Sequence, residues 1–167
     1  MARSFDPVHF GSPRFRTAEH GPFLVTDARF PAGLVLPPHE HERTVIAVTL
    51  DGGFDSVMCG RPHVCLTGTV LIEPAGERHG NHFARDTRVL ILQPDLSRRH
   101  EFEPCARALD RPVTFASVPA RTLAQRLQIE VDAPDSLSPL SIEASCLELI
   151  ALTARTLVRS RGGGPPR

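Results

Sequence analysis

Short apolar segments separated by glycine and proline fill the chain from Pro22 to about Pro94. The segments are rich in β-branched residues, and no helical pattern comes between them, which is typical of strands joined by tight turns. The pattern therefore predicts antiparallel hairpins in a β-sandwich or small barrel. The expected strands are 23–30, 44–50, 53–58, 63–67, 69–73, 80–83 and 88–93.

After Arg98 the apolar spacing changes from the period of a strand to that of a helix. In the segment 117–131, Leu123, Leu127 and Val131 recur every four residues, which predicts an amphipathic helix. Because strands come first and helices last, the pattern predicts a mainly β, α+β fold, with an antiparallel barrel or jelly roll followed by two C-terminal helices.

A longer helix is predicted from Ser138 to about 160. Ser138 is a suitable N-cap, Pro139 suits the first helical position, and the run of glycines that follows residue 161 ends the pattern. Ile142, Leu149 and Ile150 widen the apolar surface beyond a single stripe, so we expect this helix to pair two subunits as well as to pack on the barrel. The expected dimer face is Leu140, Ala144, Leu147, Ala151, Ala154 and Val158.

Length and charge limit the classes of function. The chain has 167 residues, enough for one domain with a substantial core. Its formal net charge is zero, which argues against nucleic-acid binding by this segment alone, because phosphate contacts require clustered positive charge. Neither a membrane-spanning run nor a secretory signal is evident, so we expect a cytoplasmic protein.

Three histidines form the candidate site. His39 and His41 are one residue apart, and a strand that continues from them into residues 44–50 would direct both imidazoles to one side. His79 follows a Pro-x-Gly turn that begins at Pro74 and would return beside them. Three neutral imidazoles that converge in this way suit zinc, nickel, iron or copper.

The spacing of these residues resembles the two-part signature of the cupins. The first part is Gly33-x5-His39-x-His41 followed by Gly52-Gly53, and the second is Gly68-x5-Pro74-x-Gly76-x2-His79. The resemblance covers about residues 20–95. It implies a small antiparallel barrel that encloses a ligand or metal site.

One position departs from the metal-binding cupins. Those proteins carry a glutamate four or five residues after the second histidine, where this chain has Val45 and Ile46. The choice between a divalent metal (zinc, nickel or iron) on His39, His41 and His79 and a metal-free pocket stays open, and the missing glutamate favours the latter. The residues expected to contact a ligand are His39, His41, His79, Asn81, Val45 and Ala47, with Asn81 rather than His82 on the side of His79.

A second resemblance concerns the whole chain. The segments 39–54, 68–83 and 142–167 resemble the N-terminal half of AraC-type transcription regulators. The resemblance implies a ligand-binding barrel (1–105), a helical dimerisation segment (106–160) and a linker stub (161–167). It also implies a homodimer, a small-molecule effector, and DNA contact only through a helix-turn-helix domain that is absent from this sequence.

We therefore expect an effector-sensing and dimerisation domain that is not an enzyme. The rivals are a metal-dependent cupin enzyme, such as a dioxygenase or isomerase, and a stand-alone metabolite-binding barrel. With nine phenylalanines and neither tryptophan nor tyrosine, the composition disfavours an aromatic cage around the ligand.

Overall fold

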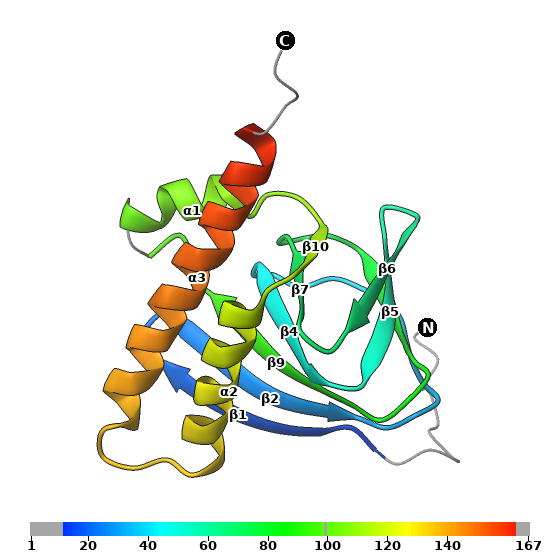
Figure 1. Ribbon diagram of the computed structural model, residues 1–167, viewed down its shortest axis with the longest axis horizontal. Helices are drawn as coiled ribbons and strands as arrows, with labels where there is room; N and C mark the ends of the chain where they lie inside the picture. The colour runs from blue at the N-terminus through cyan, green and yellow to red at the C-terminus, as the bar shows by residue number, and fades with distance from the viewer. Residues whose placement is uncertain (1–11, 99, 163–167) are drawn as a thin grey trace.

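The computed structural model describes residues 12–98 and 100–162 of the chain. Its strands form two antiparallel sheets, and helices cover one of them (Figure 1). The fold is thus mainly β with two C-terminal helices, as the sequence predicts. The strands are β1 (Arg14–His20), β2 (Phe23–Phe30), β3 (Leu34–His39), β4 (Val45–Asp51), β5 (Gly53–Met58), β6 (Arg61–Leu66), β7 (Thr69–Glu73), β8 (His79–Phe83), β9 (Thr87–Pro94) and β10 (Val113–Ala116).

The order of the strands explains how distant segments reach one site. The larger sheet runs β1-β2-β9-β4-β7-β10, and the smaller sheet runs β3-β8-β5-β6. Each of the two histidine-containing motifs, 33–53 and 68–79, therefore contributes residues to both sheets. Three of these strands lie outside the predicted set, namely β1, β3 and β10. Since β10 pairs with β7 after α1, the larger sheet includes a strand from the range 106–160 that was expected to be helical.

Four helical segments follow or interrupt the sheets: a 3-10 turn (His100–Phe102), α1 (Glu103–Ala108), α2 (Val118–Asp132) and α3 (Ser138–Gly162). The Ser117 hydroxyl caps α2 by accepting a hydrogen bond from the Ala120 N–H. At the start of α3, the Asp135 carboxylate accepts from the backbone N–H groups of Leu137 and Ser138. The expected N-cap Ser138 is therefore wrong, and Asp135 has that role.

Two hydrophobic clusters lie on opposite faces of the larger sheet. One fills the space between this sheet and the helices, and the other lies between the two sheets. Strand β2 shows the division, because Val25 faces the helices whereas Ala28 and Phe30 face the smaller sheet. In the described residues no helix packs on the outer face of the smaller sheet, where Val57 and Val64 are exposed.

Helix α3 buries a different side from the one predicted to form the dimer. Its core contacts come from Ile142, Cys146, Leu149, Ile150, Thr153 and Leu157. Ala154 was predicted to lie in the dimer face. It is instead buried in the molecule's own core, so its assignment to that face is wrong. Leu147 and Ala151 are half-buried, whereas Leu140, Ala144 and Val158 are exposed. The expected linker from residue 161 begins inside α3, and residues 163–167 lie outside the described part of the chain.

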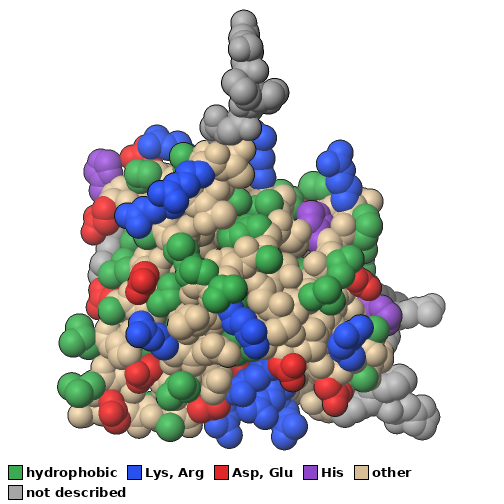
Figure 2. Space-filling model, in the orientation of Figure 1, with side chains coloured by type: hydrophobic (Ala, Val, Ile, Leu, Met, Phe, Trp, Pro, Cys, Tyr) green, Lys and Arg blue, Asp and Glu red, His purple; other side chains and the backbone are tan. Residues whose placement is uncertain are grey.

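A charged network joins the larger sheet to the end of α2. Asp27 is 2% exposed and accepts two hydrogen bonds from the guanidinium of Arg88, each of 2.7 Å. Arg88 and Arg16 both donate to Asp132 at 2.9 Å. Figure 2 shows basic side chains gathered beside acidic ones at the lower edge of the helix-covered face. None of the helices within the described residues is both long and apolar enough to cross a membrane.

Replacing Arg88 by alanine should destabilise the fold far more than replacing Arg16. Arg88→Ala leaves the buried Asp27 carboxylate without its bidentate partner, which should lower the free energy of unfolding by about 3–5 kcal/mol. Arg16 is mostly exposed and forms its ion pair with Asp132, so Arg16→Ala should cost less than about 1 kcal/mol. Urea unfolding followed by circular dichroism measures both, and equal losses would contradict the importance of Asp27.

Candidate metal and ligand site

The position of His39 depends on two prolines that interrupt β3. Pro37 and Pro38 lack the N–H that a ladder needs, and the β3–β8 register shifts between Leu36 and His39. After this bulge, His39 lies directly opposite His79 of β8. The sequence-based view that His39 begins a strand running into β4 is wrong, because His39 ends β3 and a loop follows it.

His41 lies in that loop and is held by the Pro-x-Gly turn. The backbone N–H of Gly76 donates to the carbonyl of His41 at 2.9 Å, and Glu77 closes the turn onto Pro74 at 3.0 Å. Gly76 adopts φ of +74°, a conformation that favours glycine. The turn that separates β7 from His79 therefore also positions His41.

The three imidazoles converge as predicted. Their ring centroids are 4.4 Å apart for His39–His79 and 5.1 Å for each pair with His41. One ligand atom from each of the three lies within 4.8 Å of the others. Such a cluster can hold one ion, since metal–nitrogen distances are about 2 Å.

The backbone sets the tautomer of two of these rings. His39 Nδ1 lies 2.8 Å from the Pro37 carbonyl oxygen, and His79 Nδ1 lies 3.0 Å from that of Glu77. A carbonyl can only accept, so in each neutral ring Nδ1 carries the proton and Nε2 keeps a free lone pair. His79 Nε2 is buried and has no hydrogen-bond partner. This is the arrangement in which metal-binding histidines are usually held, and the residues therefore fit a metal ion.

Sequence reasoning missed Glu73, the buried acidic residue of the site. Its Oε1 lies 3.2 Å from His79 Nε2 and its Oε2 lies 3.8 Å from His41 Nε2. Glu73 pairs across β4 and β7 with Val45, one of the positions where metal-binding cupins carry their glutamate. Paired side chains on one face are about 5 Å apart, so β7 supplies a carboxylate beside the place where β4 lacks one. The signal in the sequence was an acidic residue that ends the apolar segment 69–73, directly before Pro74.

Burial controls the charge of this group of residues. It raises the pKa of the Glu73 carboxyl to about 7. It also lowers the pKa of His79, and together with the neighbouring His79 and His39 it lowers that of His41 to about 4. Burial therefore disfavours the charged forms of both Glu73 and His79. When Glu73 ionises, two acceptors face each other at 3.2 Å, and only a proton or a metal ion between them relieves the repulsion.

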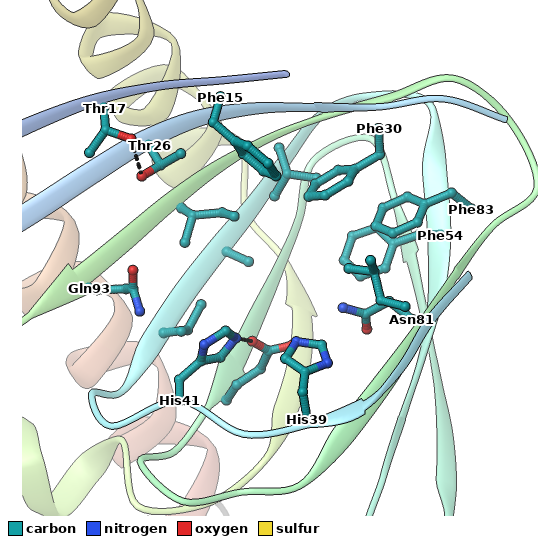
Figure 3. Close-up of a pocket in the computed structure, with 16 residues that line it drawn as sticks. Phe15, Thr17, Thr26, Phe30, His39, His41, Phe54, Asn81, Phe83 and Gln93 are labelled. Carbon is teal, nitrogen blue, oxygen red and sulfur yellow. Dashed lines mark hydrogen bonds and ion pairs between the residues drawn. The ribbon is translucent and has the colours of Figure 1, made fainter. Parts of the chain in front are cut away.

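A cavity of about 460 Å³ opens beside the histidines between the two sheets (Figure 3). Its wall is mostly apolar, with a few polar side chains among the lining residues. The lining residues are Phe15, Thr17, Thr26, Phe30, Leu36, His39, His41, Val45, Ala47, Phe54, Glu73, Asn81, Phe83, Val89, Ile91 and Gln93.

Most of the residues expected to contact a ligand face this cavity. Val45, Ala47 and Asn81 line it together with His39 and His41, whereas His79 is buried behind them at 1% exposure. His82 points outward and is exposed, as strand alternation predicts. Phenylalanines from four strands gather at one end of the cavity, although the chain as a whole is poor in aromatic residues (Figure 3).

Comparison with known proteins gives likeness to solved structures only. No protein-family model matches the chain, and no curated protein matches its sequence. KdgF from Halomonas sp. is 24% identical with a TM-score of 0.47, over 59% of this chain and 89% of that one. A cupin superfamily protein from Desulfitobacterium hafniense is 13% identical with a TM-score of 0.47, over 56% and 83%. The cupin domain of Schizosaccharomyces pombe Cnp3 is 17% identical with a TM-score of 0.45, over 53% and 70%.

Replacing Glu73 by glutamine should remove the loss of folding stability that ionisation of Glu73 causes in the metal-free protein. With its pKa raised from 4.5 to about 7, Glu73 keeps a proton in the folded state that the unfolded chain has released. Because the folded state holds this proton more tightly, the wild-type free energy of unfolding falls as the pH rises from 4.5 through 7. Glutamine resembles the protonated carboxyl, so Glu73→Gln should match the wild type at pH 4 and exceed it by about 2–3 kcal/mol at pH 8.

Urea unfolding in a chelating buffer across this range measures the difference. The histidines with lowered pKa values impose the opposite slope on both proteins, so their effect largely cancels between wild type and variant. Glu42→Gln is the control, because Glu42 is exposed. The same pH dependence in wild type and Glu73→Gln would show that Glu73 ionises normally.

Proposed function

We propose that this chain is the effector-sensing and dimerisation domain of an AraC-type transcription regulator, with a cupin-type barrel as its sensor. In this proposal a divalent metal ion at the histidine cluster and the adjoining cavity together bind a small molecule. One observation supports the sensor site above all: three imidazoles, two of them with a free Nε2, converge at one side of an apolar cavity.

The donor set supports a metal such as zinc, nickel or iron. Three nitrogen ligands and a nearby carboxylate are hard enough for iron and nickel and also suit tetrahedral zinc. When bound, the metal would supply a positive charge that attracts an oxygen atom of the ligand. The chain's own residues would hold the rest of the ligand, because the cavity wall is largely apolar.

A sensor role is supported by the way the larger sheet lies between cavity and helices. Alternate residues of β2 face opposite sides, so Thr26 and Phe30 line the cavity while Val25 and Asp27 face α2 or its charged end. Strand β9 is divided in the same way, with Ile91 toward the cavity and Leu92 toward the helices. The helices pack on these strands, so a ligand that displaces the strands would also displace the helices. This would couple the ligand site to the helical segment.

A dimer formed through α3 is the second part of the proposal. The exposed side of α3 carries Leu140, Ala144 and Val158, with Leu147 and Ala151 partly accessible at its edge. Small residues on this side permit close approach of a second helix. A symmetric pair would place two barrels in a fixed relation, and DNA contact would come from a separate helix-turn-helix domain.

A metal-dependent enzyme, for example a dioxygenase or isomerase, is the second candidate function. It is favoured by Glu73, whose pKa of about 7 would allow it to accept or donate a proton beside a bound substrate. The two functions differ in turnover. Metal-loaded protein that converts a bound metabolite would favour the enzyme, whereas release of the same molecule unchanged would favour the sensor.

Zinc binding should require the inward-facing histidines. Wild-type protein should bind one zinc ion, and His39→Ala or His41→Ala should weaken that binding at least about 100-fold, because the loss of even an outer partner of a metal site costs 10–100-fold. His82→Ala is the matched control, since His82 lies on β8 but is exposed outside the barrel. Isothermal titration calorimetry with zinc measures each affinity. Equal weakening by His82→Ala, or no binding by the wild type, would refute the site.

The dimer should separate when a charge is placed on the exposed side of α3. Leu140 is 72% exposed in the single chain, so Leu140→Glu should leave the melting temperature of the subunit unchanged but bury two unpaired carboxylates in a symmetric interface. The expected result is a folded monomer by light scattering. Val118→Glu, at a 78% exposed position on α2, should remain dimeric. A wild-type chain that is monomeric at high concentration would refute the dimer.

A further inference from the structure

Four phenylalanine rings form a continuous run along one end of the cavity. Phe30 and Phe83 stack with centroids 4.2 Å apart and an interplanar angle of 18°. Phe54 stacks on the other side of Phe83 at 5.0 Å and 26°, and Phe15 contacts Phe30 edge-on at 5.8 Å. The rings come from β1, β2, β5 and β8, so both sheets contribute to this aromatic wall.

Phe15, the outermost of the four rings, contacts Phe30 but leaves much of its apolar surface uncovered. Phe30, Phe54 and Phe83 are nearly buried, whereas Phe15 is 55% exposed although it lines the cavity. Figure 3 shows these rings across the open space from His39 and His41. A ligand that fills this space would cover Phe15 and extend the row of rings. Packing of the hydrophobic core alone does not require an exposed ring at this position.

Strand β8 arranges three kinds of side chain in a line. His79, Asn81 and Phe83 are alternate residues and face inward, and alternate residues of a strand are about 6.6 Å apart. The strand thus presents an imidazole, an amide and a phenyl ring in order from the histidine cluster to the aromatic wall.

The amide in the middle has an unmet hydrogen bond. Asn81 Oδ1 is buried and has no partner within the described residues, and the side chain is directed toward the open space (Figure 3). A buried acceptor of this kind costs about 1–3 kcal/mol unless something donates to it. A hydroxyl or N–H group of a ligand at this depth in the cavity would satisfy it.

Charge defines the end of the ligand at the histidines. Among the described residues that line the cavity there is no arginine or lysine, and Glu73 is the one acidic residue. If a divalent ion occupies the cluster, its two positive charges exceed the single negative charge that Glu73 can carry, so the site is positive in either state of Glu73. That charge attracts a monoanion such as a carboxylate.

We infer that the ligand of this cavity is a small arylalkanoic acid. Its ring lies against the phenylalanine run, a hydroxyl or amino group on its chain meets Asn81, and its carboxylate points to the histidine cluster. This inference rests on the proposed metal- and ligand-binding function and adds the chemical class of the ligand.

The ring is tested by calorimetry of zinc-loaded protein with 3-phenylpropanoate and 3-cyclohexylpropanoate. The two acids match in length and charge, but only the first has an aromatic face. Aromatic pairs add about 0.5–1.5 kcal/mol beyond area burial, so the phenyl acid should bind about 3- to 10-fold more tightly. Phe15→Leu should remove about threefold of this preference and leave the cyclohexyl acid unchanged. The exposed Phe15 is chosen because truncating the buried Phe83 would disturb folding.

The middle group is tested with 2-hydroxy-3-phenylpropanoate. The added hydroxyl should improve binding by about 3- to 10-fold over 3-phenylpropanoate, and Asn81→Leu should abolish the gain. His82→Leu, on the outer face of the same strand, should keep it. A gain that survives in Asn81→Leu would overturn the role of Asn81.

The remaining outcomes separate this inference from the proposed function. Equal or tighter binding of the cyclohexyl acid, or no binding of any of these acids by protein that does bind zinc, overturns the arylalkanoic class and leaves the metal site standing. Failure to bind zinc refutes the metal site itself and with it the carboxylate end of the inferred ligand. A phenyl-to-cyclohexyl ratio of one or less in zinc-free protein then overturns the aromatic end as well.

Discussion

A carboxyl and an imidazole that face each other inside the barrel determine the chemistry of this molecule. Glu73 Oε1 and His79 Nε2 are 3.2 Å apart, and both side chains are buried. Backbone carbonyls hold the protons of His79 and His39 on the opposite ring nitrogens. An ionised Glu73 therefore faces a second acceptor, and a proton or a metal ion between the two would relieve the repulsion. The prolines of β3 and the glycine turn after β7 place His39 and His41 beside this pair.

The sequence predicts most of the scaffold because its signals are local. Gly and Pro mark the ends of β2, β5 and β7 at the residues where the structure has them, and the four-residue spacing of Leu123 and Leu127 locates α2. The convergence of the three histidines was predicted from their spacing, although the strand assumed to contain both His39 and His41 was wrong, because His41 lies in a loop. Strands β1 and β10 were missed because neither has a clear alternation of apolar and polar residues.

The site's carboxylate could not be predicted in the same way. Glu73 reaches the histidines because β7 pairs with β4 at Val45, and strand pairing is a non-local property that one segment does not reveal. The side of α3 that packs inward was also ambiguous, since Ile142 and Leu149 compete with Leu140 and Leu147 at helical spacing. Composition alone could not indicate the aromatic wall, because it is the topology that brings four phenylalanines together at one end of the cavity.

The two sheets that enclose the cavity differ in what lies behind them, and this difference bears on how the pocket can diversify. The larger sheet is fixed from outside by α2 and the Arg88 network. In the described residues the smaller sheet has no helix on its outer face, and side chains such as Val57 and Val64 meet solvent there. Substitutions on β5, β6 or β8 can thus reshape one wall without disturbing the helices. Homologous chains could acquire new ligand preferences on that wall while the opposite wall keeps its packing against the helices.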